Sequence, residues 1–187
     1  ILAIEVYGES REDCERQAGA IVDDLQEASL GFAFPVVHPP RDKRVWALRK
    51  AGLGLLMGIE GDRKPVTVVE DTAVRPQALP EYIEEFSDIM TRYGTQCVYY
   101  AHASVGELHL RPELNLKDPD DARRFEEIAH DVADLVRRYR GALSGEHGDG
   151  RVRSPLLREF YGDDLMEVHE RVKEAFDPQG IFNPGKI

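Results

Sequence analysis

The stretch "QCVYYAHASVGELHLRPEL", residues 96–114, decides the fold of this chain. Two β-rich runs flank a Val-Gly pair, which predicts two antiparallel strands joined by a tight turn. A hairpin centred on Val105–Gly106 places His102 directly opposite His109, so that their Cβ atoms lie roughly 4.5–5.5 Å apart. Two imidazoles at this separation can share one metal ion, but a hydrogen-bonded pair without metal satisfies the same spacing.

Outward from the hairpin, apolar residues recur at every third or fourth position, which is typical of helices with one buried face. Helices are expected over residues 10–28, 42–56, 78–94 and 118–141, with shorter helical pieces at 154–162 and 165–176. Further strands are expected over residues 1–8, 32–37 and 64–74.

Strands and helices alternate along the chain except where the hairpin interrupts them, and this pattern predicts an α+β fold. We expect a largely antiparallel sheet covered by helices, as in a ferredoxin-like cap domain, over residues 1–140. Residues 141–187 are richer in loops, Pro and Gly, so we expect them to form a separate C-terminal segment of helices and loops.

Composition excludes several classes of protein. The chain has 187 residues, 42% of them hydrophobic, so it can bury a core, and its net charge of −11 argues against binding to nucleic acid or to anionic lipid. Cys14 and Cys97 lie far apart, which fits a reducing compartment, and no apolar run is long enough for a membrane span. We therefore expect a cytoplasmic protein, or one peripheral to the membrane. The absence of an initiator Met suggests a piece of a longer polypeptide.

The segment "LSGEHGDGRVRSPLL", residues 143–157, places acidic and imidazole side chains among glycines. A solvated turn would account for this composition, but loops of this kind also carry catalytic groups. Glu146 or Asp149 can supply a third ligand to a metal held by two histidines, which leaves positions open for a substrate. In an extended stretch His147 points away from Glu146, and we therefore predict that His147 is a general base.

Three cations close to these motifs are candidates for binding an anionic substrate, although each is equally consistent with an ordinary surface charge. They are Arg49, Lys64 and Arg111. Arg111 lies two residues after His109 and therefore on the same face of a strand.

Three motifs together resemble the C-terminal part of FAD-linked oxidases of the vanillyl-alcohol-oxidase type. They are "HASVGELHLRP", "SGEHGDGR" and the ending "FDPQGIFNPGKI". The branch that they resemble contains D-lactate dehydrogenases, glycolate oxidase subunits and D-2-hydroxyglutarate dehydrogenases. "WALRKAGLGLL" and "VEDTAVRPQALPEYI" are similar to the large bacterial members, which carry an iron–sulfur region.

The resemblance implies a role for each candidate residue. His102, His109 and Glu146 match the ligands of a divalent metal, zinc or manganese, and His147 matches the base. Arg49 and Lys64 match groups that hold substrate carboxylates, and Asn183 matches a residue near the flavin. FAD itself is held mainly by an N-terminal domain, which would be a partner of this segment.

The sequence departs from the family pattern between its two histidines. Metal-dependent members commonly read His-x-Gly-Asp-Gly-Asn-Leu-His-x-Asn, whereas Arg111 stands here at the position of the last Asn. The resemblance implies a D-2-hydroxy acid as the substrate, and an Arg at this position, which can bind a second carboxylate, favours a dicarboxylic one. The expected reaction is oxidation to the 2-oxo acid with hydride transfer to FAD. A metal-dependent hydrolase and a non-catalytic ferredoxin-like binding module are the alternatives.

Overall fold

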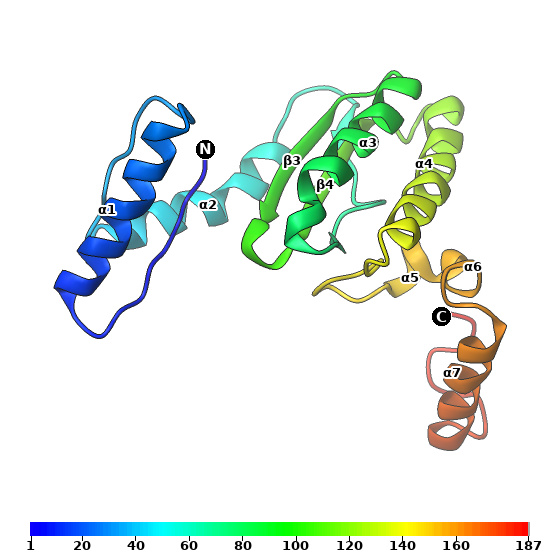
Figure 1. The fold of residues 1–187 in the computed structure, drawn as a ribbon. Coiled ribbons are helices and arrows are strands. Elements are labelled where there is room, and N and C mark those ends of the chain that lie inside the picture. Colours follow the sequence, from blue (N-terminus) through cyan, green and yellow to red (C-terminus); the bar gives the residue numbers. More distant parts are fainter. Residues whose placement is uncertain (187) are drawn as a thin grey trace. The chain divides into compact units, whose positions relative to one another are not determined.

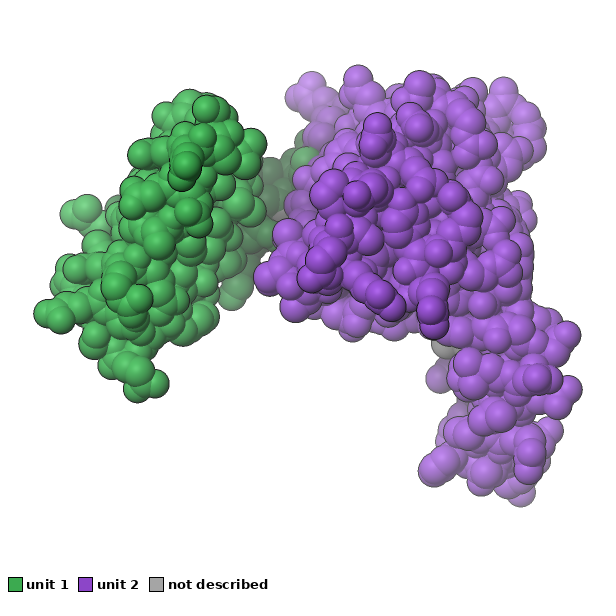
Figure 2. Space-filling view, in the orientation of Figure 1, with its two compact units in different colours: residues 1–58 green, residues 59–187 purple. Residues whose placement is uncertain are grey.

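The computed structural model describes residues 1–186, apart from the side chain of Leu53. The chain forms two compact units, residues 1–58 and residues 59–187 (Figure 2). The division expected from the sequence, at residues 140 and 141, stays a prediction.

The first unit contains two helices, as the sequence predicts. They are α1 (Arg11–Glu27) and α2 (Asp42–Met57). Ser10 caps α1, because its hydroxyl accepts a hydrogen bond from the backbone N–H of Asp13. The strands expected at residues 1–8 and 32–37 are wrong, because within residues 1–186 neither segment pairs with another strand, and a lone extended segment has no ladder to join.

The second unit combines a small sheet with helices (Figure 1). Its strands are β1 (Lys64–Pro65), β2 (Thr72–Ala73), β3 (Cys97–His102) and β4 (Glu107–Leu114). Its helices are α3 (Leu79–Arg92), α4 (Pro119–Arg138), α5 (Gly150–Arg153), α6 (Leu157–Tyr161) and α7 (Asp163–Phe176).

The sheet is antiparallel and is organised around β4. Strand β3 pairs with one edge of β4, while β1 and β2 pair with the two ends of its other edge. The expected α+β fold with a largely antiparallel sheet is therefore confirmed.

The hairpin of β3 and β4 forms in a register different from the expected one. His102 pairs with Glu107, and Tyr100 pairs with His109, so the predicted direct pairing of the two histidines is wrong. The turn occupies residues 103–106 and ends at Gly106 in the left-handed region with φ +74°, which moves its centre one residue towards the N-terminus. A shift of two residues in the pairing preserves the faces of a strand, so the histidines remain diagonal neighbours on one face.

The single strand expected over residues 64–74 is interrupted by a bulge. Between the pairs Pro65–Glu113 and Thr72–Leu108, six residues of this segment face four residues of β4. The bulge ends at Asp71, whose φ of +74° lies in the left-handed region. Bulges bend a strand and redirect its side chains, and this one directs Glu70 and Asp71 towards β4.

The two faces of β4 differ in chemistry because successive side chains alternate. Leu108 and Leu110 belong to the hydrophobic core, together with side chains of α3 and α4 such as Phe86 and Val132. The opposite face carries three buried polar residues, Glu107, His109 and Arg111. Packing in the core therefore fixes β4 in place, and its opposite face presents titratable side chains.

Among residues 1–186, no helix combines the length and the apolar character that crossing a membrane requires.

Candidate functional site

Three charged or titratable side chains are buried on the polar face of β4. Glu107, His109 and Arg111 expose only 7%, 3% and 5% of their surface. Burying such groups costs free energy unless they have partners of complementary charge or hydrogen-bonding type. The partners come from the bulge before β2 and from residues 141–150 after α4, which we call the glycine-rich segment.

The glycine-rich segment is held beside β2 by backbone hydrogen bonds. Ala73 and Ala142 exchange two bonds of 3.0 and 2.8 Å, and the N–H of Gly145 donates to the carbonyl of Asp71 over 2.7 Å. This pairing brings Glu146 and His147 to the polar face of β4.

Asp71 fixes the same segment through its side chain. Its carboxylate accepts the hydroxyl of Ser144 and the backbone N–H groups of Glu146 and His147, the last two over 2.8 and 2.9 Å. Burial alone would raise the pKa of Asp71, but these hydrogen bonds outweigh it and lower the pKa to about 2. Asp71 is therefore a charged anchor for the segment.

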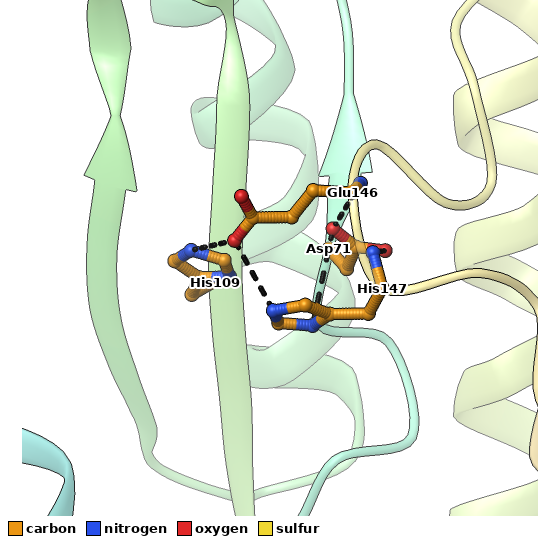
Figure 3. Close-up of side chains that lie close together, drawn as sticks. All are labelled: Asp71, His109, Glu146 and His147. Atoms are coloured by element: carbon orange, nitrogen blue, oxygen red, sulfur yellow. Dashed lines mark hydrogen bonds and ion pairs between the residues drawn. The ribbon is translucent and has the colours of Figure 1, made fainter.

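Three further side chains lie close to Asp71, as Figure 3 shows. They are His109, Glu146 and His147. One oxygen of Glu146 lies 3.6 Å from Nε2 of His109 and 3.1 Å from Nε2 of His147. The two imidazoles are stacked, with ring centroids 5.3 Å apart and planes inclined by 14°. A nucleophile or cation entering here would meet two imidazoles and a carboxylate at once.

A second layer of charge lies behind His147. Nδ1 of His147 is 3.3 Å from one oxygen of Glu70, and the other oxygen of Glu70 forms an ion pair with Arg111. The guanidinium of Arg111 also lies over the ring of Tyr100, 5.7 Å from its centroid. The buried arginine thus has an anion on one side and an aromatic face on the other.

The pKa values of two neighbouring carboxyl groups, Asp71 and Glu107, are shifted in opposite directions. Burial, together with a hydrogen bond to Asp71, raises the pKa of Glu107 to about 7, so this carboxyl can hold a proton close to neutrality. Burial is also the main reason why the pKa of His109 is lowered, with a contribution from the nearby His102. A neutral imidazole is the form that binds metal ions.

The donor set fits a divalent cation. Among the described residues, ligand atoms of Asp71, His109, Glu146 and His147 lie within 4.8 Å of one another. Nδ1 of His109 is buried without a hydrogen-bond partner. Two imidazoles with carboxylates are typical of zinc, manganese and iron sites that keep positions open for a substrate. Asp71 already accepts three hydrogen bonds, so the donor atoms that can meet a cation or a substrate are those of His109, Glu146 and His147.

The structure brings together only some of the residues selected from the sequence. His109, Glu146, His147 and Arg111 lie in or beside the cluster. His102 stands outside the compact group of donors, although its ring centroid is 5.3 Å from that of His109. Its role as a ligand stays a prediction.

Of the other three selected residues, two lie elsewhere in the second unit and one lies in the first unit. Lys64 pairs with Leu114 at the far end of β4, about 16 Å along the strand from His109, and its ammonium group donates to the carbonyl of Ile59. Arg49 belongs to α2 in the first unit, and Asn183 lies in the tail after α7 with a φ of +47°. Their roles in binding substrate and flavin stay predictions.

Sequence reasoning missed Glu70, Asp71 and Glu107. The signal was present, because "VVED" places two adjacent acids directly after buried valines in a run that otherwise reads as a strand. A strand would send the two carboxylates to opposite faces, whereas the bulge lets both contact the glycine-rich segment.

Comparison with known proteins gives matches over the whole chain. Residues 1–187 match the family described as "FAD linked oxidases, C-terminal domain". The chain is 35% identical to a D-2-hydroxyglutarate dehydrogenase of Haemophilus influenzae over 98% of its own length and 18% of the relative. It is 29% identical to the glycolate oxidase subunit GlcD of Escherichia coli (97% of the chain, 35% of the relative) and 33% identical to a D-lactate dehydrogenase of Archaeoglobus fulgidus (68% and 28%). The chain thus spans about a fifth to a third of the length of these relatives.

Proposed function

The chain belongs to the family of C-terminal domains of FAD-linked oxidases, and from this premise we propose that it is the substrate-binding part of a flavin-dependent dehydrogenase. The proposed reaction is the oxidation of a D-2-hydroxy acid to the 2-oxo acid. One observation carries the proposal: two imidazoles and two carboxylates converge within 4.8 Å beside a buried arginine. The names of the relatives support this class of substrate over the hydrolase and the non-catalytic module.

Each residue of the cluster has a task in this proposal. His109 and Glu146 would hold a divalent ion, zinc or manganese, with His102 as a further ligand from the neighbouring strand. A bound divalent ion would supply positive charge that lowers the pKa of the substrate hydroxyl. His147 then accepts the hydroxyl proton at Nε2, the ring nitrogen that faces Glu146 and the metal ligands.

Arg111 is the proposed partner of a substrate carboxylate at this end of β4. Its Nε is buried without a hydrogen-bond partner, so the guanidinium retains a donor beyond its ion pair with Glu70. An arginine here, rather than a neutral amide, favours a dicarboxylic 2-hydroxy acid. Bound FAD, held mainly by another domain, would supply the two-electron acceptor for the hydrogen on the substrate α-carbon. An iron–sulfur region elsewhere in the longer protein is a further proposed partner of this segment.

A panel of D- and L-2-hydroxy acids tests the proposal in the longer, flavin-containing protein. Turnover is followed with an artificial electron acceptor, before and after treatment with a chelator and after the metal is returned. We expect turnover of D-acids only, loss on chelation and recovery with zinc or manganese. Turnover that is independent of flavin, or that is absent for every hydroxy acid, would contradict the proposal.

A further inference from the structure

We propose that Glu70 is a positioning residue, which orients His147 and fixes the ring nitrogen that carries its proton. This inference rests on the proposed function, because it gives His147 the role of general base. It adds a residue to which the sequence analysis assigned no role. The geometry points to a chain of three charged groups, Arg111, Glu70 and His147, that extends from the buried face of β4 to the reacting centre.

The first step concerns the position of the Glu70 side chain. Its side chain lies in the bulge before β2, and the residue exposes only 9% of its surface. A buried carboxylate needs a partner, and Arg111 supplies one through an ion pair to Oε2. Arg111 itself is held on β4 by strand pairing with Val98 and by its contact with the ring of Tyr100. Glu70 is therefore held in place by Arg111 and cannot turn freely.

The second step concerns the two nitrogens of His147. Nδ1 lies 3.3 Å from Oε1 of Glu70, and Nε2 lies 3.1 Å from Oε1 of Glu146. A carboxylate can only accept, and a neutral imidazole has a single N–H to donate. Glu70 is buried and fixed, whereas the side chain of Glu146 is 49% exposed and is free to turn towards a cation. We therefore place the N–H at Nδ1, which faces Oε1 of Glu70.

The tautomer decides whether the base can work. With the hydrogen at Nδ1, the lone pair of Nε2 faces the metal ligands and the substrate hydroxyl. When Nε2 takes the hydroxyl proton, the imidazolium carries N–H groups on both nitrogens, and the Nδ1–H still faces Glu70. The adjacent negative charge stabilises this imidazolium. A carboxylate, an imidazole and a reacting hydroxyl in this order are the arrangement that orients histidine bases in other enzymes.

Asp71 is the other carboxylate near Nδ1, but it is the weaker candidate. Its Oδ1 lies 3.9 Å from Nδ1 of His147, beyond hydrogen-bonding distance. Its oxygens already accept the Ser144 hydroxyl and the two backbone N–H groups of Glu146 and His147. Asp71 thus holds the backbone of the segment, while Glu70 orients the imidazole.

The test uses Glu70→Gln and Glu70→Asp in the longer, flavin-containing protein. Gln keeps the size of the side chain but loses the charge, and Asp keeps the charge but withdraws it from Nδ1. We expect both to lower kcat, Glu70→Gln by about 10–100-fold, with little change in KM. The matched control is Glu85→Gln, which removes a carboxylate paired with Arg138 outside the site and should leave kcat unchanged. Flavin absorbance and thermal unfolding verify that each variant is folded.

A double-mutant cycle separates positioning from a structural role. Glu70→Gln is introduced into a His147→Ala background, and the slow residual reduction of the flavin is followed without oxygen. If Glu70 acts through His147, it causes no further loss in that background. An active wild type whose kcat survives Glu70→Gln, or an equal loss in both backgrounds, would overturn the inference. A wild type whose flavin is reduced by no 2-hydroxy acid would instead overturn the proposed function.

Discussion

Asp71 has no exposed surface and accepts hydrogen bonds from the Ser144 hydroxyl and from the backbone of Glu146 and His147. Asp71→Asn keeps the shape of the side chain but turns one acceptor into an N–H donor that faces other donors. We expect a loss of about 1–3 kcal/mol in the free energy of unfolding, because buried donors lose a charged partner. Denaturant unfolding at neutral pH measures this loss.

Ser144→Ala is the graded control for the same anchor. It removes one of the three donors and leaves both backbone N–H groups bonded to Asp71. We expect it to cost about 1 kcal/mol or less, since the hydroxyl is only half-buried and is replaced by a methyl group. Equal costs for the two substitutions would show that Asp71 does not hold the segment through its backbone.

At the scale of single elements, the turn of the hairpin depends on a glycine. Gly106 has φ +74°, and a Cβ at this position would lie 1.8 Å from the carbonyl oxygen of Val74. Gly106→Ala must therefore displace the hairpin from the segment after β2. Gly94, with φ +60° and nothing within 4 Å of the added Cβ, is the matched position.

We expect Gly94→Ala to cost about 1–2 kcal/mol, the strain of a left-handed alanine alone. Gly106→Ala should cost clearly more than this, because strain and a clash with backbone add together. Thermal unfolding of the two variants side by side measures the difference. If their costs are the same, the close approach of Gly106 to Val74 is not a feature of the folded protein.

The N-terminal end of α4 is fixed by Asp121, which is 2% exposed. Its carboxylate accepts the N–H of Asn115 over 2.8 Å and pairs with Arg63 and Arg124. The hydrogen bond from Asn115, supported by the two arginines, lowers its pKa. Since the folded pKa is lower than the unfolded value of about 4, the ionised group stabilises the fold above pH 4. This stabilisation is lost as the pH falls through the folded pKa.

Asp121→Asn should therefore cost about 1.5–3 kcal/mol at pH 7, and the cost should shrink as the pH is lowered below 4. Denaturant unfolding of wild type and variant at pH 7 and at pH 3 measures the change. Asp134→Asn is the control, because Asp134 forms an exposed pair with Arg137 on the same helix. A cost for Asp121→Asn that is equal at both pH values would contradict a charged Asp121.

Local periodicity was enough to predict the helices and the hairpin, but pairing partners were not visible in it. Residues 64–74 read as one strand because valines dominate them, and nothing local reveals that two extra residues bulge out opposite β4. The two histidines were assigned to one face correctly, because the error in register was an even number of residues. Glu70 and Asp71 were missed because their role depends on contacts with a segment more than seventy residues away.

At the scale of the whole molecule, the cluster joins three separate parts of the second unit: the bulge, strand β4 and the glycine-rich segment. A metal held by His109 of β4 and Glu146 of the glycine-rich segment would stabilise the folded state and not the unfolded one, so its affinity is linked to stability. At a free metal concentration of 100 times Kd, the gain is about 2.7 kcal/mol. We expect zinc or manganese to raise the unfolding temperature of the protein, and a chelator to reverse the increase.

His109→Ala removes the most deeply buried of the proposed ligands and should abolish this metal-dependent increase. His102→Ala tests the predicted third ligand: a reduced increase supports its assignment, and a full increase removes it from the set. His130→Ala is the control. His130 lies on α4, pairs with Glu159 of α6 and is not one of the residues of the cluster. Since the proposed metal would link β4 to the glycine-rich segment, the loss of a ligand should be visible in the stability of the whole unit. An increase that is equal in wild type and His109→Ala would show that the metal binds elsewhere and that the imidazole of β4 holds no ion.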